Sequence, residues 1–321
     1  MWEHGFSYIL PHTSLMLQDR MQGNNQTQLG IILLNWNAAE HTARYVKSLR
    51  EWHRLTFCVY VVDNGSTQGT LQFEENGDIP VCLLKSPINR GYAGGNNIGI
   101  RKAIEEGCEY ILLLNNDAFI SEENVELLLN KLQKNADIGC IGPSIHEGDH
   151  VFLGGRDIGI YPIPRNISSH AMKKEEIIYV DYVPGMAFLT RREVIERIGF
   201  LDEQFFFSGE IADFCRRAVK EGFQCAICPK IRADHVLESD NPYRNTLYQY
   251  YSLRNRFLFV RKHHAKLRWI LEPFWVLVGI RMYIRMIRMW QKKESMAYRM
   301  AIVDGMRGVF GDRNDLFHCD G

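Results

Sequence analysis

The chain has 321 residues, of which 38 are lysine or arginine and 38 are aspartate or glutamate, so its formal net charge is zero. Hydrophobic residues make up 46% and charged residues 24%, which is typical of a soluble globular protein and excludes a largely disordered chain or a small disulfide scaffold. A neutral chain also argues against nucleic-acid binding by bulk electrostatics, so no nucleic-acid partner is expected.

Residues 1–28 form a polar N-terminal extension that lacks the pattern of a secretory signal, because its apolar stretch at 6–10 is short and closed by Pro11. The eight cysteines lie mostly in apolar runs, where reduced cysteine behaves as a small buried hydrophobe. Cys225 and Cys228 have CxxC spacing without a second pair, so core packing is favoured over a redox or zinc site. A cytoplasmic, reducing location is expected.

Apolar runs alternate with helical patterns from residue 29 onward. The predicted strands are the runs 29–34, 57–62, 79–84, 110–114 and 138–141. The predicted helices lie between them, at 39–52, 96–106 and 121–134, the last with Ser121 as its N-cap. Continuous apolar strands alternating with helices indicate an α/β fold with a parallel sheet covered on both faces.

Polar side chains follow three of the predicted strands. They are Asn35, Asn37, Asp63, Asn64, Asn116 and Asp117. The carboxyl ends of parallel strands share one edge of the sheet, where ligands bind, so these side chains predict a binding site. Asp117 is a hard oxygen ligand of the kind that Mg²⁺ or Mn²⁺ takes together with substrate phosphates, although an N-cap or turn aspartate is the alternative. His235, after an apolar run, is by itself more often a structural residue.

The segment 89–97, Asn-Arg-Gly-Tyr-Ala-Gly-Gly-Asn-Asn, has glycines that allow a close approach of the backbone to a ligand. It runs into a helix N-terminus suited to anions. The segment matches neither the dinucleotide fingerprint nor the P-loop pattern, which disfavours both of those functions.

Glu210 follows an aromatic run, 205–207, at the start of a predicted helix. An apolar surrounding raises a carboxyl pKa and suits Glu210 to general-base work. Asp213 and Arg217 share its helix face and form an i,i+4 ion pair, so a solvated salt-bridged face is the alternative.

In this order and spacing, the segments resemble the family-two inverting glycosyltransferases with the GT-A fold, and among them the rhamnosyltransferase-like enzymes of bacterial surface-polysaccharide assembly. The matching segments are 32–37 (Ile-Leu-Leu-Asn-Trp-Asn), 61–66 (Val-Val-Asp-Asn-Gly-Ser), 89–97, 113–117, 185, 189–192, 198–206, 217–218 and 235. The resemblance implies a GT-A catalytic domain at 29–240 with a mostly parallel central sheet, followed by a helical C-terminal region at 241–321.

The resemblance also implies roles for individual residues. Asp63 would contact the base of the nucleotide, and Asn115-Asn116-Asp117 stands at the family's Asp-x-Asp metal motif. The expected nucleotide-binding residues are Asn35, Trp36, Asp63, Asn89, Gly91, Gly94, Asn96 and Asn116. The expected ligands of Mn²⁺ or Mg²⁺ are Asp117 and His235, and the expected catalytic residues are Glu210 and Asp213.

Two positions depart from the family pattern. Asn115 replaces the first acid of the metal motif, which predicts a weaker metal dependence. Ile211 stands where the family has its base, and isoleucine cannot take a proton. Glu210, one position earlier, is favoured as the base. Activation of the acceptor by another route and loss of activity are the alternatives.

The expected reaction moves a sugar from a UDP- or dTDP-linked donor to a hydroxyl of a glycan or lipid-linked acceptor. One rival is a sugar nucleotidyltransferase, which would release pyrophosphate. The other is a catalytically impaired scaffold that binds nucleotide sugars, which Ile211 and Asn115 suggest.

Residues 254–293 contain eleven basic residues and one acid, so the rest of the chain is net acidic. Within this stretch the apolar run 269–280 is interrupted by Glu272 and Pro273 and is too short to span a bilayer. A basic face on the following helix, 281–292, beside apolar faces with a tryptophan, predicts association with an anionic membrane surface, peripheral on the inner face of the cell membrane. A packed helical subdomain or a homo-oligomer contact is the alternative.

Overall fold

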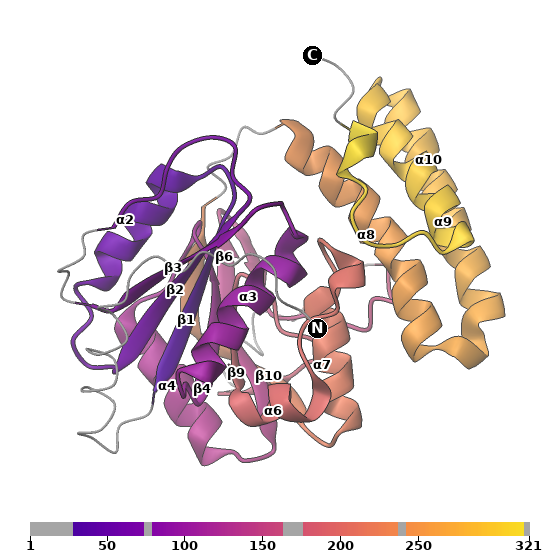
Figure 1. Ribbon diagram of the computed structural model, residues 1–321. Coiled ribbons are helices and arrows are strands. Elements are labelled where there is room, and N and C mark those ends of the chain that lie inside the picture. The colour runs from indigo at the N-terminus through magenta and orange to yellow at the C-terminus, as the bar shows by residue number, and fades with distance from the viewer. Residues whose placement is uncertain (1–27, 74–78, 163–175, 237–241, 318–321) are drawn as a thin grey trace, which may run out of the picture.

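The computed structural model describes residues 28–73, 79–162, 176–236 and 242–317 (Figure 1). The N-terminal extension therefore lies outside the described residues except for residue 28, and so does Cys319.

Ten strands form one mixed sheet in the order β3-β2-β1-β4-β9-β6-β10-β5, with β7 paired to β6 and β8 to β10. Their bounds are β1 (Leu29–Asn35), β2 (Phe57–Asn64), β3 (Val81–Ser86), β4 (Tyr110–Asn115), β5 (Ala118–Phe119), β6 (Ile138–Glu147), β7 (His150–Phe152), β8 (Ile178–Tyr179), β9 (Ala187–Arg191) and β10 (Gln224–His235). The first four strands in the chain are parallel, as are β6 and β10. The predicted strands are confirmed, but β9 is inserted antiparallel between β4 and β6.

Helices cover both faces of the sheet, giving the α/β architecture that the sequence predicts. Their bounds are α2 (Ala39–Leu49), α3 (Gly91–Glu105), α4 (Glu122–Lys134), α6 (Arg192–Ile198) and α7 (Glu210–Lys220). One core packs α2 and α4 against the sheet, and the other packs α3, α6 and α7 against its opposite face. The predicted cap of α4 is confirmed, because the Ser121 hydroxyl accepts from the Asn124 backbone N–H.

The predicted start of α3 at residue 96 is wrong, because the helix begins at Gly91. Its glycines allow the helix to lie very close to the sheet. A Cβ on Gly95 would lie 2.4 Å from Leu34 Cδ1, and one on Gly99 would lie 2.6 Å from Ile32 Cγ2. The glycines of this segment therefore allow α3 to pack closely on the sheet. This role could not be recognised while residues 91–95 were predicted to precede the helix.

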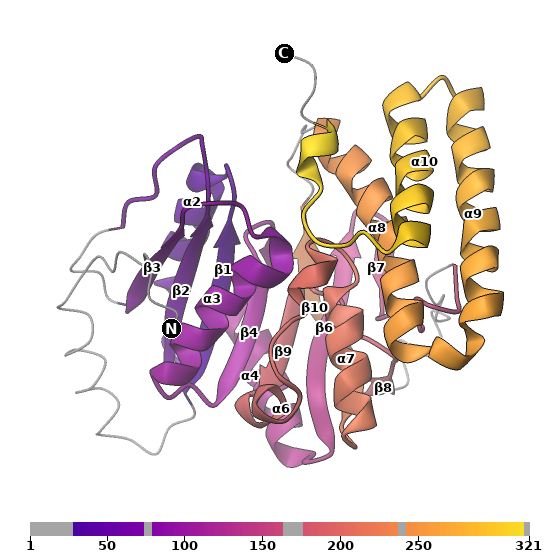
Figure 2. The ribbon, with the colours of Figure 1, turned by 45° about the vertical axis from the view of Figure 1, so that its right-hand side comes forward.

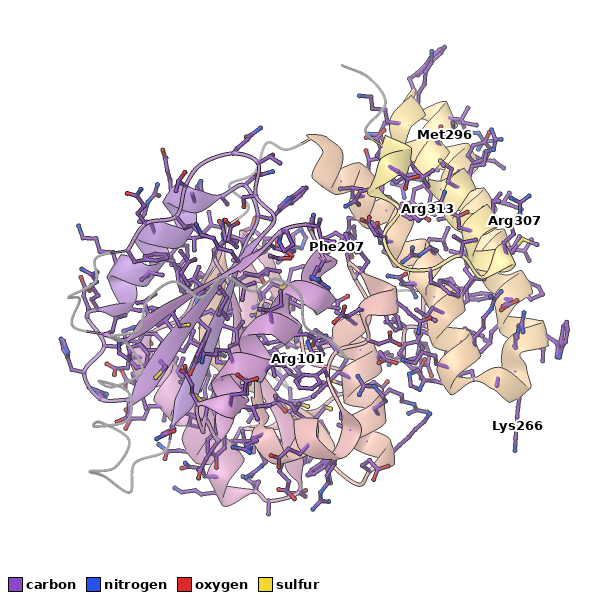
Figure 3. The ribbon with its side chains drawn as sticks, in the orientation of Figure 1. Arg101, Phe207, Lys266, Met296, Arg307 and Arg313 are labelled. Carbon is purple, nitrogen blue, oxygen red and sulfur yellow. The ribbon has the colours of Figure 1, made fainter. Side chains whose placement is uncertain are left out.

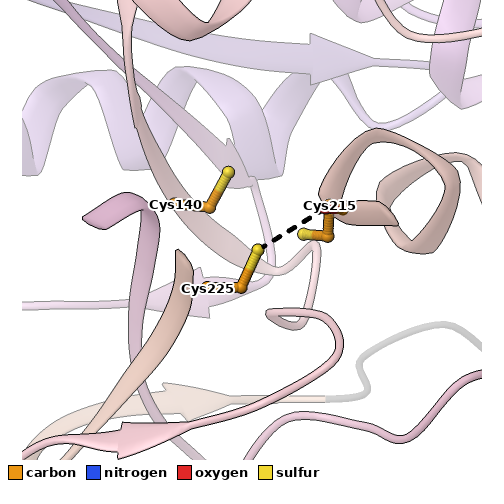
Figure 4. A group of neighbouring side chains, drawn as sticks. All are labelled: Cys140, Cys215 and Cys225. Atoms are coloured by element: carbon orange, nitrogen blue, oxygen red, sulfur yellow. Dashed lines mark hydrogen bonds between the residues drawn. The ribbon is translucent and has the colours of Figure 1, made fainter. Parts of the chain in front are cut away.

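The described cysteines are free thiols, as expected. Cys225 and Cys228 belong to cores on opposite faces of the sheet, which rules out a joint role for the CxxC pair. Cys225 instead lies with Cys140 and Cys215, their sulfur atoms within 4.8 Å of one another (Figure 4). All three are buried in the apolar core beneath α7, where they fill space as small hydrophobes.

The C-terminal region is a helical layer beside the catalytic sheet, made of α8 (Pro242–His263), α9 (Arg268–Arg288) and α10 (Lys292–Arg307). Figure 2 shows α10 between α8 and α9, with α9 outermost. Its core includes Tyr250, Phe257 and Trp275 and extends to Phe206 of the catalytic part. Among the described residues, no helix has the length and apolar character needed to cross a bilayer.

The predicted end of the helix at residue 292 is wrong. The helix α9 ends at Arg288, and Trp290 in the following turn has φ of +59°. Lys292 therefore starts α10 and leaves the α9 face that it was expected to share. Pro273 lies in the second turn of α9 without ending it, and Glu272 is held by ion pairs with Arg261 and Arg268.

Candidate active site

Three strand ends meet in a polar network at the carboxyl edge of the sheet. The Asn35 side-chain amide at the end of β1 donates to Asp63 Oδ1 (3.3 Å) and to Ser66 Oγ (3.0 Å). The Thr42 hydroxyl in α2 donates to Asn35 Oδ1 (2.9 Å) and accepts from the Asn116 amide (2.9 Å). Three of the residues predicted from the sequence are thus joined: Asn35 bonds Asp63 directly and is linked to Asn116 through Thr42.

Trp36 follows this network and remains about one-third exposed, while Asn35 is buried. An exposed aromatic ring beside a half-buried carboxylate, that of Asp63, is a suitable wall for a flat heterocycle. Asp63 also stabilises the turn that follows β2, since its Oδ1 accepts from the Ser66 backbone N–H.

Asp117 and His235 lie together at the neighbouring strand end. The strand β5 pairs with β10 so that Ala118 lies opposite His235, and the Val236 N–H donates to the Asp117 carbonyl oxygen. His235 Nε2 lies 3.3 Å from Asp117 Oδ1, and its Nδ1 lies 2.7 Å from Glu147 Oε2. Burial lowers the pKa of His235, but the two carboxylates outweigh burial and raise it overall.

This donor set fits a divalent cation. A carboxylate oxygen and an imidazole nitrogen face each other, both buried, at a separation that one ion could bridge. The other imidazole nitrogen is held by a carboxylate, which is the usual second partner of a metal-binding histidine. Sequence reasoning missed Glu147 because it ended the strand at residue 141. The strand β6 continues to Glu147, whose position at a strand end is the signal that was available.

The opposite wall is formed by the start of α3. Asn64 donates to Asn89 Oδ1 (2.9 Å) and accepts from the Arg90 N–H (2.9 Å), which ties β2 to this segment. The N–H of Gly91 is used by Asn89 Oδ1, and the N–H of Tyr92 donates to the carbonyl of Phe206. These helix N-terminal donors are therefore occupied by protein oxygens, which contradicts the expectation of an open anion site there.

Two further predicted residues, Gly94 and Asn96, lie within α3. The side chain of Asn96 donates to the Tyr92 carbonyl within the helix. A Cβ on Gly94 would lie 2.7 Å from Arg90 Cβ and 3.2 Å from Glu203 Oε2. Both residues are buried, and helix packing fixes their position.

Glu210 begins α7 and is buried. Burial, opposed by a backbone hydrogen bond and aided by the charge of Asp213, raises its pKa from 4.5 to about 7. Its Oε2 accepts no hydrogen bond from the described residues. A carboxylate that is half ionised near neutral pH and has an open acceptor atom is suited to take a proton.

Tyr92 lies in the first turn of α3. Burial raises the tyrosine pKa, and the nearby charges of Glu210 and Asp117 raise it further. Its hydroxyl donates to the Gly185 carbonyl (2.7 Å), and a Cβ on Gly185 would press on both Tyr92 and Ile211. Ile211 is part of the apolar core, so the carboxyl group at the start of α7 is that of Glu210, one position before the family's base position.

Asp213 has a different environment. The predicted ion pair is confirmed at 2.9 Å from Arg217 Nε to Asp213 Oδ2. The carboxylate is fully buried and also pairs with Lys262 (2.6 Å) and His263 (2.7 Å) of α8. Burial alone would raise its pKa, but these partners lower it to about 2. Asp213 therefore joins α7 to α8, and the solvated-face alternative is wrong.

A strained turn precedes Glu210. Phe206, Ser208 and Gly209 all have positive φ, at +61°, +71° and +99°. The Asn255 amide of α8 donates to the carbonyls of Phe205 (2.8 Å), Phe207 (3.0 Å) and Ser208 (2.6 Å). Figure 3 labels Phe207 on the side of the catalytic part that faces α8.

Arg254 adds to this clamp. Its guanidinium donates to the carbonyls of Gln204 (3.3 Å), Phe205 (3.2 Å) and Gly311 (2.7 Å). The C-terminal helices thus fix the backbone that delivers Glu210. Sequence reasoning counted Arg254 only as part of a basic stretch.

The mixed sheet with its cluster at the carboxyl edge defines a GT-A glycosyltransferase fold. The sequence pattern named "Glycosyl transferase family 2" matches residues 30–199, about half of the chain, and the protein belongs to that family. It is a glycosyltransferase.

Named relatives are similar over most of their length. The hexosyltransferase Agl10 of low-salt glycan biosynthesis in Haloferax volcanii is 29% identical over 74% of this chain and 77% of its own. The dTDP-rhamnosyl transferase RfbF of Shigella flexneri is 28% identical over 79% and 88%. The N-acetylglucosaminyl-diphospho-decaprenol L-rhamnosyltransferase of Mycobacterium tuberculosis is 23% identical over 76% and 89%. These relatives agree with the rhamnosyltransferase-like subgroup that the sequence motifs predict.

Among solved structures, the mannosyltransferase PcManGT of Pyrobaculum calidifontis, in complex with GDP-Man and Mn²⁺, has a TM-score of 0.58. Its sequence is 12% identical, and the similarity covers 93% of this chain and 96% of that one. The likeness confirms the GT-A fold and includes the helical C-terminal region.

Proposed function

We propose that the protein is an inverting glycosyltransferase that moves a sugar from a UDP- or dTDP-linked donor to a hydroxyl of a glycan or lipid-linked acceptor in surface-polysaccharide synthesis. The observation that supports this proposal is the pair of buried atoms Asp117 Oδ1 and His235 Nε2, which face each other 3.3 Å apart. Glu210, at the start of α7, has a buried Oε2 without a hydrogen-bond donor among the described residues and is the candidate base.

The nucleoside would bind against the joined strand ends. Asp63, held by Asn35, would offer its carboxylate to the base or ribose, and Trp36 would offer a ring face. Asn116 would lie beside the ribose. Asn89, Gly91, Gly94 and Asn96 would form the opposite wall, contacting the donor through the surface of the α3 start, because its first N–H groups are already used.

Asp117 and His235 would hold Mn²⁺ or Mg²⁺, with Glu147 orienting the imidazole. The nitrogen ligand favours Mn²⁺, since Mg²⁺ prefers oxygen ligands. When bound, such an ion would stabilise the negative charge of the departing diphosphate.

Glu210 would act as the general base. Its Oε2 takes the proton of the acceptor hydroxyl, whose oxygen forms a bond to the anomeric carbon from the side opposite the diphosphate. The bond from that carbon to the diphosphate oxygen breaks, and the nucleoside diphosphate leaves. In-line displacement inverts the configuration at the anomeric carbon.

The names of the relatives support a lipid-linked acceptor and a location at the membrane. RfbF is named as a dTDP-rhamnosyl transferase, and the name of the mycobacterial relative contains the lipid diphosphate N-acetylglucosaminyl-diphospho-decaprenol. A lipid-linked acceptor would place this enzyme at the inner face of the cell membrane, where both the activated donor and the lipid diphosphate are accessible.

The test uses purified protein, UDP- and dTDP-sugars, Mn²⁺ or Mg²⁺, and short diphospholipid acceptors. We expect release of nucleoside diphosphate and a product of inverted anomeric configuration. Glu210→Gln should lower turnover by about 10²–10⁴-fold and leave donor binding intact. Release of pyrophosphate would identify a nucleotidyltransferase instead, and donor binding without turnover on any acceptor would identify a scaffold.

A further inference from the structure

The outer face of α9 is an apolar strip without a cover among the described residues. Trp269, Ile270 and Leu277 expose 83%, 69% and 67% of their surface, and Ile280 and Ile284 continue the strip. The inner face of α9 is occupied, because Trp275 is buried and donates from Nε1 to the Gly159 carbonyl. The exposed strip is therefore a surface in addition to the packing face of the helix.

The strip is bordered by uncommitted positive charge. Of the eleven basic residues at 254–293, the five at 254, 256, 261, 262 and 268 are engaged with carboxylates, carbonyls or aromatic rings of the protein. Arg281, Arg285 and Arg288 are exposed and form no ion pair within the described residues. Lys266 points away from the protein at the turn before α9 (Figure 3).

Acidic residues do not balance these charges. Residues 265–309 contain three acids and nine basic residues. Glu272 pairs with Arg261 and Arg268, and Asp304 is buried against Tyr250 and Arg313. Glu294 is half-buried in the first turn of α10. The α9 face is consequently apolar along its middle and cationic at its border.

Tryptophans stand at both ends of the strip. Trp269 is in the first turn of α9, and Trp290, 86% exposed, lies in the turn after it, in a left-handed conformation that non-glycine residues rarely adopt. About 20 residues separate them, which in a helix is about 30 Å. Tryptophan prefers the boundary between lipid chains and headgroups, so two of them suit a helix lying flat on a bilayer.

We propose that this α9 face, from Trp269 to Trp290, docks the enzyme on an anionic lipid surface. The apolar strip enters the boundary between headgroups and chains, and Arg281, Arg285 and Arg288 contact lipid phosphates. A second copy of the chain suits the face poorly, because a twofold contact would bring the same arginines against one another. Docking on a membrane is independent of the sugar-transfer chemistry, so it would hold even if the proposed donor or acceptor were wrong.

The experiment is co-sedimentation of the full chain with vesicles of phosphatidylcholine containing about 30% phosphatidylglycerol, and with vesicles of phosphatidylcholine alone. We expect Arg281→Gln/Arg285→Gln/Arg288→Gln to weaken binding to the anionic vesicles about 100-fold, at about fivefold per charge. Trp269→Ala and Trp290→Ala should each weaken binding to these vesicles about tenfold. Arg44→Gln/Lys47→Gln/Lys134→Gln, on exposed positions of α2 and α4, is the matched control and should bind as wild type.

Donor hydrolysis without vesicles, measured in parallel, separates this proposal from the proposed function, since the α9 variants should hydrolyse donor as wild type does. Equal vesicle binding by wild type and the triple arginine variant would overturn the proposal. So would self-association of wild type in solution that Leu277→Ser abolishes, because the strip would then be a contact between copies.

Discussion

Replacing Glu210 by glutamine should stabilise the protein at alkaline pH while removing its activity. The Glu210 carboxyl has a pKa of about 7 in the folded chain against an ordinary value of 4.5, chiefly because it is buried. A raised pKa means that the folded state binds the proton more tightly than the unfolded state does. The stability contributed by the protonated carboxyl is complete below pH 4.5 and is lost as pH rises through 7.

The magnitude follows from that difference. At 1.36 kcal/mol per pKa unit, the rise from 4.5 to about 7 corresponds to about 3 kcal/mol. Glutamine has a similar shape and no charge, so the variant escapes this loss. The free energy of unfolding of Glu210→Gln minus that of wild type should therefore increase by about 3 kcal/mol between pH 4.5 and pH 8.

The assay is urea unfolding of both proteins across this pH range, with a chelator and without donor, so that ligand binding does not shift the equilibrium. Other titrating groups are shared and cancel in the difference. Glu221→Gln, at an exposed carboxyl just after the same helix, is the control and should show a pH-independent difference. A pH-independent difference for Glu210→Gln as well would refute the assignment of a buried, proton-accepting carboxyl.

Three further substitutions test the surroundings of the site. Asn255→Ala leaves three carbonyls of the strained turn without their donor and should lower turnover with little change in the KM for the donor. Asn255→Asp keeps the size of the side chain but loses the donor, so it should not restore turnover. An increase in KM without a loss of turnover would contradict the positioning role. Glu147→Gln should weaken Mn²⁺ binding by about 10–100-fold in a direct titration, and unchanged affinity would remove Glu147 from the metal site. Asp213→Ala leaves buried cations uncompensated and should cost about 3 kcal/mol of stability by urea unfolding, whereas a cost below 1 kcal/mol would mean that the α7–α8 ion pairs matter little.

The sequence predicts the first half of the fold well because its strands are buried on both faces and appear as continuous apolar runs. The runs before Asn35, Asp63 and Asn116 place those residues at one edge, where Asn35 bonds Asp63 directly and Thr42 links Asn35 to Asn116. That threonine has no distinguishing pattern, since its role depends on a helix packing against two strands.

The parts that escaped prediction depend on distant contacts. The strand β9 lies antiparallel between β4 and β6, which come much earlier in the chain, and no local pattern fixes its neighbours or direction. Asn255 and Arg254 act on carbonyls about 50 residues earlier in the chain. A count of charges places Arg254 only within a basic stretch and does not show that its side chain is buried, as it is in the structure.

The shift of the candidate base from position 211 to 210 has a physical explanation in this clamp. Adjacent residues of a helix point about 100° apart, so a carboxylate moved by one position would normally leave the site. Here the helix begins directly after three positive-φ residues, and Asn255 holds the carbonyls of that turn. The turn therefore sets the direction of the first helical side chain, Glu210, while Ile211 fills the apolar core beside Gly185. The isoleucine that suggested a loss of activity is thus a core residue, while the buried carboxyl with the raised pKa is that of Glu210, the residue before it.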